Sequence, residues 1–309
     1  MTTAIPLRER SPDRPGPGPL PEALLRALDL KVGRRIEGLL AGEHRTSWVG
    51  LGTEIAQVRE WEPGDDVRRI DWNATARTGD VQVRVDVAER ALTSWVLLDV
   101  SPSMTFGTAD RRKWDVAEGV AVALGHLASR RGNRIGVATF GGRESQILRP
   151  RQGRAGLLGV LLAVRRDPET ERVGHTSLGE GLTRLARVAR QRAVVAVVSD
   201  FRGPRDWRAP LLRLAAGHEV LAIEIRDPRE QEIPDLGYVW LVDPETGRRA
   251  QVDTGRRRVR ERFAAAAAED RANLNRELTS LGVSHAVLST AGDWLRPLAS
   301  FLERGRRRR

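Results

Sequence analysis

The sequence predicts an α/β protein built on a doubly wound, mainly parallel sheet. Short apolar runs rich in Val, Leu and Ile alternate along the chain with segments whose apolar residues follow helical spacing. Strands that alternate with helices form a parallel sheet covered on both faces, and such buried strands are continuous apolar runs. The predicted buried strands are 95–100, 134–140, 193–199, 219–225 and 283–288, with 146–148 as an edge strand.

The segments between these strands carry the signals of helices. A helix is predicted over 111–131, with an apolar face and a stop at Gly132. Ser177 and Glu180 form an S-x-x-E capping box that begins another helix. Further helices are predicted over 157–164, 207–216, 259–281 and 294–302.

The region before the sheet has a different character. It contains a helical pattern over 22–40 and two segments that alternate like inserted β-strands, at 53–61 and 81–91. Proline and glycine dominate the residues before that helix, which predicts disorder. We therefore expect a disordered lead-in at 1–21, an N-terminal helix and β-subdomain at 22–92, the main domain at 93–303 with an inserted hairpin at 238–253, and an Arg-rich tail at 304–309.

The composition excludes several classes of protein. The chain of 309 residues has no cysteine, so disulfides, thiolate metal sites and cysteine nucleophiles are ruled out. No apolar run is long enough to cross a bilayer, and the N-terminus lacks the apolar core of a signal peptide. We expect a soluble, cytoplasmic protein.

The strong positive charge has two explanations. A net charge of +11 and a pI of about 11.2 are compatible with binding to nucleic acid or to an acidic surface. However, Lys31 and Lys113 are the only lysines, and the abundance of Arg, Ala and Gly is typical of a genome-wide compositional bias. We therefore do not expect nucleic acid to be the main partner.

Oxygen-bearing side chains follow two of the predicted buried strands. Asp99, Ser101 and Ser103 come after the first strand, and Asp200 comes after the third. The carboxyl ends of parallel strands meet at one edge of the sheet, where ligands of open α/β sheets bind. If Ser177 caps its helix, the hydroxyl of Thr176 just before it is free to join the same edge.

Two carboxylates and three hydroxyls at one edge would form an all-oxygen site. Mg²⁺ or Mn²⁺ takes oxygen ligands, and Mg²⁺ usually keeps several waters. Some of these groups would act through water, which leaves a coordination position open for a carboxylate from another molecule. The sequence contains no Gly-rich phosphate loop, no H-E-x-x-H motif, no ligand spacing among its five histidines and no nucleophile beside an oriented base. We therefore expect a binding protein and not an enzyme.

A second stretch, 60–77, is dense in acids, arginines and tryptophans around a Pro-Gly-Asp turn. We predict that it is chiefly structural, with its two tryptophans packed and Arg68 and Arg77 paired with its three aspartates. Its principal residues are Trp61, Gly64, Asp65, Asp66, Arg68, Asp71, Trp72 and Arg77.

Both stretches resemble known motifs. Asp99-x-Ser101-x-Ser103, Thr176 and Asp200 resemble the metal-ion-dependent adhesion site (MIDAS) of von Willebrand factor A domains. The stretch from Gly64-Asp65-Asp66 to Trp72, followed by Ala76-Arg77, is similar to the signature of the bacterial and archaeal domain-of-unknown-function family fifty-eight, and the stretch 42–45 also fits that family. The resemblance covers roughly 24–302; His175 departs from it, because adhesion-site loops usually have glycine there.

The resemblance implies a doubly wound sheet of von Willebrand factor A type and a MoxR-type AAA+ ATPase as partner. Many relatives carry N-terminal transmembrane helices, and this chain resembles the short soluble branch. The function expected from the residues and the resemblance together is that of a metal-dependent protein-binding adaptor. It would act with that ATPase in the assembly or activation of a client complex whose identity the sequence does not give.

Two other functions remain open at this point. One is a metal-dependent phosphohydrolase, because an aspartate after a strand with a second one downstream is also a phosphatase pattern. Against it, Ser101 stands where the phosphatase loop usually has its second carboxylate. The other is nucleic-acid binding through the arginine runs at 256–258 and 306–309.

Overall fold

The computed structural model describes Pro17 and residues 55–86, 93–130, 133–142, 145–164 and 177–304. The chain divides into two compact units, one formed by Ile36–Ala91 and one by Met1–Arg35 together with Leu92–Arg309. The helix predicted over 22–40 lies outside the described residues, as do nearly all of the lead-in and all but the first residue of the Arg-rich tail.

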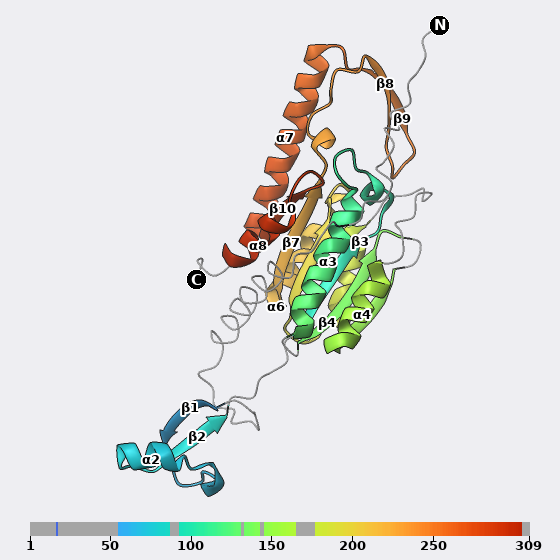
Figure 1. The fold of residues 1–309 in the computed structure, drawn as a ribbon. Helices are drawn as coiled ribbons and strands as arrows, with labels where there is room; N and C mark the ends of the chain where they lie inside the picture. Colours follow the sequence, from blue (N-terminus) through green and yellow to red (C-terminus); the bar gives the residue numbers. More distant parts are fainter. Residues whose placement is uncertain are drawn as a thin grey trace. The chain divides into compact units, whose positions relative to one another are not determined.

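The larger unit contains a six-stranded sheet in the order β10-β7-β6-β3-β4-β5 (Figure 1). Five neighbouring strands are parallel, and β5 runs antiparallel to β4 at one edge. This arrangement confirms the predicted doubly wound, mainly parallel sheet. The strands are β3 (Thr93–Asp99), β4 (Arg134–Phe140), β5 (Ile147–Gln152), β6 (Val194–Ser199), β7 (Glu219–Arg226) and β10 (Ser284–Ser289).

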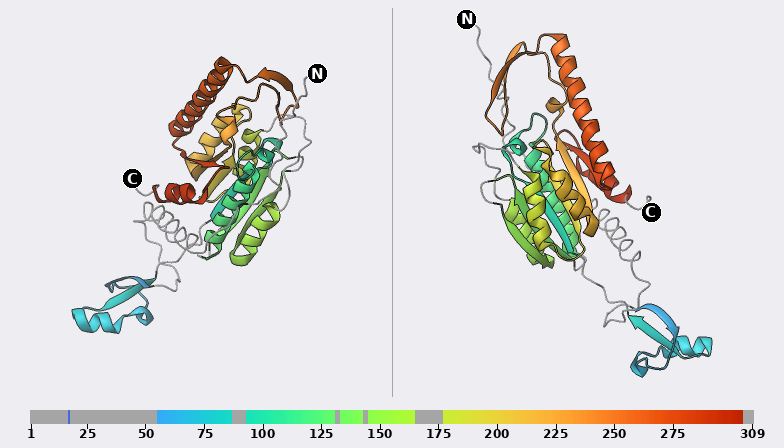
Figure 2. Two further views of the ribbon diagram at one scale, coloured as in Figure 1. Left: turned by 45° about the horizontal axis from the view of Figure 1, so that its top comes forward. Right: turned by 180° about the vertical axis from the view of Figure 1, so that it is seen from behind.

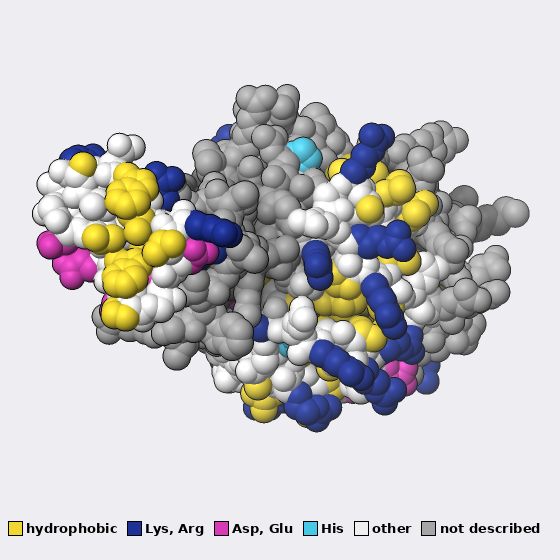
Figure 3. Space-filling model, turned by 90° about the horizontal axis from the view of Figure 1, so that it is seen from below, with side chains coloured by type: hydrophobic (Ala, Val, Ile, Leu, Met, Phe, Trp, Pro, Cys, Tyr) yellow, Lys and Arg dark blue, Asp and Glu magenta, His cyan; other side chains and the backbone are white. Residues whose placement is uncertain are grey.

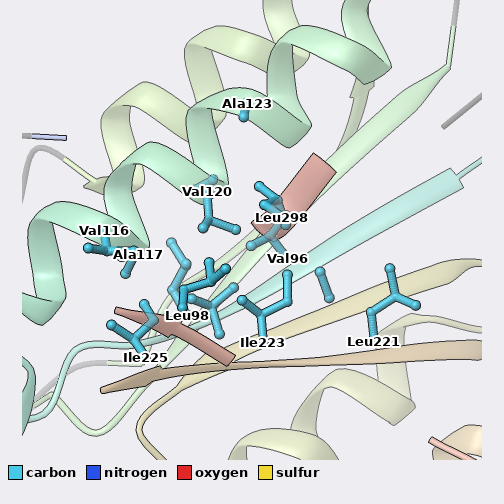
Figure 4. Close-up of a cluster of buried hydrophobic side chains, with 14 of the residues drawn as sticks. Val96, Leu98, Val116, Ala117, Val120, Ala123, Leu221, Ile223, Ile225 and Leu298 are labelled. Carbon is cyan, nitrogen blue, oxygen red and sulfur yellow. The ribbon is translucent and has the colours of Figure 1, made fainter. Parts of the chain in front are cut away.

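Helices cover both faces of the sheet because the central strands place apolar side chains on each face. Val96 and Leu98 of β3 face one cluster of buried side chains, which includes residues of α3, α4 and α8 (Figure 4). Trp95 and Leu97 face a second cluster, with residues of α5, α6 and α7. The helices are α3 (Lys113–Arg130), α4 (Gly153–Val164), α5 (Leu178–Val188), α6 (Arg208–Gly217), α7 (Arg257–Ser280) and α8 (Leu295–Arg304).

Shorter elements complete this unit. The predicted hairpin is present as β8 (Tyr238–Val242) and β9 (Arg249–Asp253), which pair only with each other among the described strands. Three single turns of 3-10 helix lie in its loops: η2 (Pro102–Thr105), η3 (Arg205–Trp207) and η4 (Pro228–Glu230). None of the helices in the described ranges is long and apolar enough to cross a bilayer.

The smaller unit is described from residue 55 to residue 86. Its strands β1 (Ile55–Glu60) and β2 (Gln82–Asp86) are antiparallel, with η1 (Val67–Arg69) and α2 (Trp72–Thr78) between them. The sequence did not predict α2. The helix begins there because the Asp71 carboxylate accepts hydrogen bonds from two backbone N–H groups of its first turn, both at 3.0 Å. It ends at Gly79, whose φ of 84° is a left-handed conformation suited to glycine.

The ion pairs of this unit differ from the prediction. Asp65 pairs with Arg59 of β1 through two hydrogen bonds of 2.7 and 2.8 Å, and Asp71 pairs with Arg84 of β2 at 2.9 Å. The signature acids therefore bind the two strands and not the arginines of their own stretch. The physical reason is that the antiparallel pairing of β1 and β2 places Arg59 and Arg84, which lie outside the stretch 60–77, beside the segment that connects the two strands.

The predicted roles of the other signature residues are also corrected. Trp72 is 69% exposed, so it is not packed as predicted. Arg68 has an exposed side chain, while its backbone N–H donates to Asp66 at 3.0 Å. Arg77 donates to the Asn73 carbonyl within its own helix. Hydrophobic side chains are thus left on the surface of this unit, the group of coloured atoms at the left of Figure 3, and they include Val58, Val67, Trp72 and Val81.

Candidate functional site

The two predicted carboxylates lie at the same edge of the sheet because β3 and β6 are neighbours in register. Leu98 pairs with Val198, so both strands end together. Asp99 closes β3 and Asp200 directly follows β6, and both side chains are buried. The prediction that these two acids meet is confirmed.

Asp99 is held in place by two neutral donors. Its Oδ1 accepts the backbone N–H of Ser101 at 2.9 Å, and its Oδ2 accepts the Ser199 hydroxyl at 2.6 Å. Only 2% of Asp99 is exposed, and within the described ranges no basic side chain is paired with it. It is therefore a buried acid without a balancing charge.

The two predicted serines lie beside it. A proline follows Ser101 and begins the η2 turn, which brings the chain back on itself. The hydroxyls of Ser101 and Ser103 are 3.0 Å apart, and both residues are buried. The D-x-S-x-S segment thus forms one cluster of oxygen atoms, as its spacing predicted.

The two carboxyl groups have pKa values that move in opposite directions. Burial, together with repulsion from Asp200, raises the pKa of Asp99 to about 7. Burial also acts to raise the pKa of Asp200, but its ion pair with Lys113 outweighs burial and lowers it. Asp200 is therefore ionised at neutral pH, whereas Asp99 is only partly ionised there and has no basic partner among the described residues.

Lys113 is a member of the site that the sequence analysis missed. It is the first residue of α3 and is completely buried, with Nζ 2.5 Å from Oδ2 of Asp200 and 2.8 Å from Oε1 of Glu230. These two acids outweigh the effect of burial and raise the pKa of Lys113, so the ammonium stays charged. A signal was available, because Lys113 is one of two lysines in a chain whose basic residues are otherwise arginine.

A third acid approaches the site from the β8–β9 hairpin. Oε1 of Glu245, in the turn between the two strands, accepts the backbone N–H of Ser103 at 3.2 Å. The sequence pattern predicts the hairpin but indicates no role for its turn. Nothing in the local pattern shows where a hairpin inserted more than 130 residues after Ser103 will fold.

The last predicted ligand cannot be placed. Thr176 lies outside the described residues, as does His175. The cap that was expected to leave Thr176 free is confirmed, because Ser177 Oγ accepts the backbone N–H of Glu180 at 2.9 Å and begins α5.

The residues in place fit a hard divalent cation. The donors are the carboxylates of Asp99 and Asp200 and the hydroxyls of Ser101 and Ser103, all oxygen, as Mg²⁺ or Mn²⁺ requires. Buried charges in proteins are paired or bound to metals, and Asp99 has no basic partner within the described ranges. Those ranges contain no cluster of three His, Cys, Asp or Glu residues arranged for a metal.

Comparison with known proteins identified a matching family and similar mycobacterial proteins. A family model described as "Protein of unknown function DUF58" matches residues 57–273. Uncharacterised proteins of Mycobacterium bovis and Mycobacterium tuberculosis are 39% identical over 287 residues, which cover 92% of this chain and 90% of each relative. An uncharacterised protein of Mycobacterium avium is 42% identical over 132 residues, 42% of this chain and 76% of that protein.

Solved structures with a related fold were also found. The BatB protein of Bacteroides thetaiotaomicron has a TM-score of 0.44 at 12% identity, covering 70% of this chain and 98% of its own. An aerotolerance-related membrane protein of Bacteroides fragilis has a TM-score of 0.45 at 14% identity, covering 69% and 98%. The VWA domain of SpRpn10 has a TM-score of 0.37 at 14% identity, covering 69% and 94%.

Proposed function

Since the chain belongs to the family described as protein of unknown function DUF58, and its main domain is a doubly wound, mainly parallel sheet, we propose that it is a metal-dependent protein-binding adaptor. In this proposal the edge of the sheet at Asp99 and Asp200 holds Mg²⁺ or Mn²⁺ and binds a carboxylate of a partner protein. The role is one of binding and not of catalysis.

One observation carries the proposal: Asp99 is a buried acid without a basic partner among the described residues, in a cluster with two serine hydroxyls. A purely structural aspartate at the end of a strand would be paired or solvated, because an isolated buried charge is costly. Among the described residues, the ammonium at the site is that of Lys113, which is bound to Asp200 and Glu230.

Each residue has a separate task in this proposal. Asp99, Ser101 and Ser103 would hold the cation, and Ser199 orients the Asp99 carboxylate through its hydroxyl. Lys113 fixes Asp200 and keeps it ionised. When bound, the cation would supply positive charge and an open position for an external carboxylate.

The partner is proposed from the resemblance of the sequence to its family. We propose a MoxR-type AAA+ ATPase and a client protein, with the adaptor assisting assembly or activation of the client complex. No feature of the described residues identifies the client.

Calorimetric titration of Mg²⁺ and Mn²⁺ into the purified protein tests the proposal, followed by a pull-down with the ATPase in the presence of metal or EDTA. We expect one weak site that Asp99→Ala abolishes and Ser101→Ala weakens less, because a charged ligand contributes more than a neutral one. Glu232→Ala, which removes an exposed acid elsewhere, is the matched control. Metal affinity unchanged in Asp99→Ala would refute the proposed site.

A further inference from the structure

We propose that the β8–β9 hairpin is an internal ligand for the cation site, with the Glu245 carboxylate occupying the position that a partner's carboxylate would take. The inference rests on the proposed function of the site and adds a regulatory element to it. Partner binding would then require the hairpin turn to leave the site.

The contact between Glu245 and Ser103 carries this inference. The carboxylate reaches the backbone N–H of a residue in the middle of the D-x-S-x-S cluster, across a separation of 142 residues. In Figures 1 and 2 the hairpin lies at the end of the sheet where the loop after β3 emerges. A carboxylate of this chain is therefore already beside the group of oxygens proposed to bind the cation.

The turn that carries Glu245 is well organised. Oδ1 of Asp243 accepts the backbone N–H of Glu245 at 2.9 Å, and Oδ2 accepts the Thr246 hydroxyl at 2.5 Å. Gly247, with φ of 69°, donates its N–H to the Asp243 carbonyl at 2.8 Å and closes the turn. These bonds lower the entropic cost of presenting the Glu245 side chain, because the backbone around it is already ordered.

Hydrogen bonds hold the base of the hairpin, at the end opposite the turn. The Thr254 hydroxyl donates to the Gly237 carbonyl at 2.9 Å and accepts the N–H of Leu236 at 3.0 Å. Arg260 of α7 donates to the Thr254 carbonyl at 2.6 Å. The base of the hairpin is thus anchored to the rest of the domain independently of the turn.

Between these two ends the hairpin has little support. It joins no other sheet in the described part of the chain, and the outer face of β8 exposes Tyr238, Trp240 and Val242, although Val239 on the inner face is buried. A two-stranded hairpin alone is marginally stable in water. Segments of this kind open at low free-energy cost, so the turn can leave the site while the base stays in place.

Electrostatic interactions make docking of the hairpin turn, which carries Glu245, depend on the cation. Asp200 is already paired with Lys113, but Asp99 is not, so without the cation an ionised Asp99 and the Glu245 carboxylate repel each other. With a cation bound, the same carboxylate is attracted. Cation binding and hairpin docking must therefore strengthen each other by the same factor.

Mn²⁺ titration of wild type, Glu245→Ala and Glu245→Gln, combined with hydrogen exchange over 238–253, tests the inference. In wild type we expect Mn²⁺ to slow exchange in the hairpin. In Glu245→Ala we expect that slowing to vanish and Mn²⁺ affinity to fall by roughly five- to tenfold, a modest coupling. Glu245→Gln keeps the side-chain length and an acceptor oxygen, so its loss should be smaller. Glu232→Ala should behave as wild type.

A second experiment adds acetate to the Mn²⁺ titrations. In Glu245→Ala the vacated position accepts acetate, which should restore Mn²⁺ affinity, whereas acetate should have little effect on wild type. Equal Mn²⁺ affinity in wild type and Glu245→Ala, with unchanged hairpin exchange, would overturn the internal ligand and leave the cation site standing. Failure of wild type to bind Mn²⁺ at all would overturn the proposed function, and the internal ligand with it.

Discussion

The ammonium of Lys113 lies 2.5 Å from the carboxylate of Asp200, and both side chains are buried. The pair joins the start of α3 to the end of β6, and Glu230 after β7 accepts a second bond from the same ammonium. One lysine thus fixes one of the two carboxylates at the candidate site, whereas the other, Asp99, has only neutral partners among the described residues.

Replacing Lys113 with methionine should destabilise the protein by about 3–5 kcal/mol, because it leaves the buried Asp200 and the partly buried Glu230 without their cation. Urea unfolding in EDTA measures the loss. Asp200→Asn in the same background should recover part of the stability. Arg257→Ala breaks an exposed pair with Glu261 and is the control, with an expected change of about 0.5 kcal/mol or less. A Lys113→Met protein as stable as wild type would show that the buried pair contributes nothing.

Asp99→Asn should abolish Mn²⁺ binding without unfolding the protein. The amide has nearly the same shape: its oxygen can accept the Ser101 N–H, and its NH2 group can donate to the Ser199 hydroxyl oxygen. Removing the charge also relieves the repulsion from Asp200. Thermal unfolding in EDTA should therefore give a melting temperature at or above that of wild type. A clear fall in the melting temperature of Asp99→Asn would mean that the charge of Asp99 is balanced by a group outside the described residues.

Ionisation of Asp227 should make the free energy of unfolding depend on pH in the acidic range. Burial acts to raise its pKa, but hydrogen bonds from Thr108, Thr290 and Arg229 outweigh burial and hold the pKa below 3.8. Because the folded-state pKa is depressed, this stabilisation is complete above pH 3.8 and is lost as the pH falls through the folded-state pKa.

Denaturant unfolding of wild type and Asp227→Asn from neutral pH downward tests this sign. At neutral pH the variant should be less stable by about 1–3 kcal/mol, because buried donors lose a charged acceptor. The difference should shrink as the pH falls below 3.8. A difference that is constant across this range would show that the pKa of Asp227 is not depressed by folding.

In the smaller unit, stability should depend on Asp71 and not on Arg68. Asp71→Ala removes both the cap of α2 and the pair with Arg84, whereas Asp71→Asn keeps a capping side chain and loses only the charge. Hydrogen exchange over 55–86 should therefore increase most in Asp71→Ala, less in Asp71→Asn and least in Arg68→Ala. Equal effects of Arg68→Ala and Asp71→Ala would restore the original prediction that Arg68 is paired.

Local sequence signals determined the sheet and most of its helices. The apolar runs that end at Asp99 and Ser199 are buried strands because each contains enough consecutive Val and Leu to fill both faces. The Ser177 cap and the D-x-S-x-S turn also depend only on neighbouring residues, so their geometry followed from spacing. Strand order at the centre of the sheet then placed Asp99 beside Asp200, since parallel strands expose the same end.

Tertiary structure alone decided which charges meet. Lys113 reaches acids 87 and 117 residues away, and Glu245 reaches the backbone of Ser103 across 142 residues. In the smaller unit, Asp65 and Asp71 took arginines from the flanking strands, where the sequence suggested Arg68 and Arg77. Hydrophobic periodicity determines which face of a helix or strand is buried. A long charged side chain, in contrast, pairs with whichever group the packing of distant elements brings within a few ångströms. Several partners are compatible with the same local pattern, and only the folded chain selects among them.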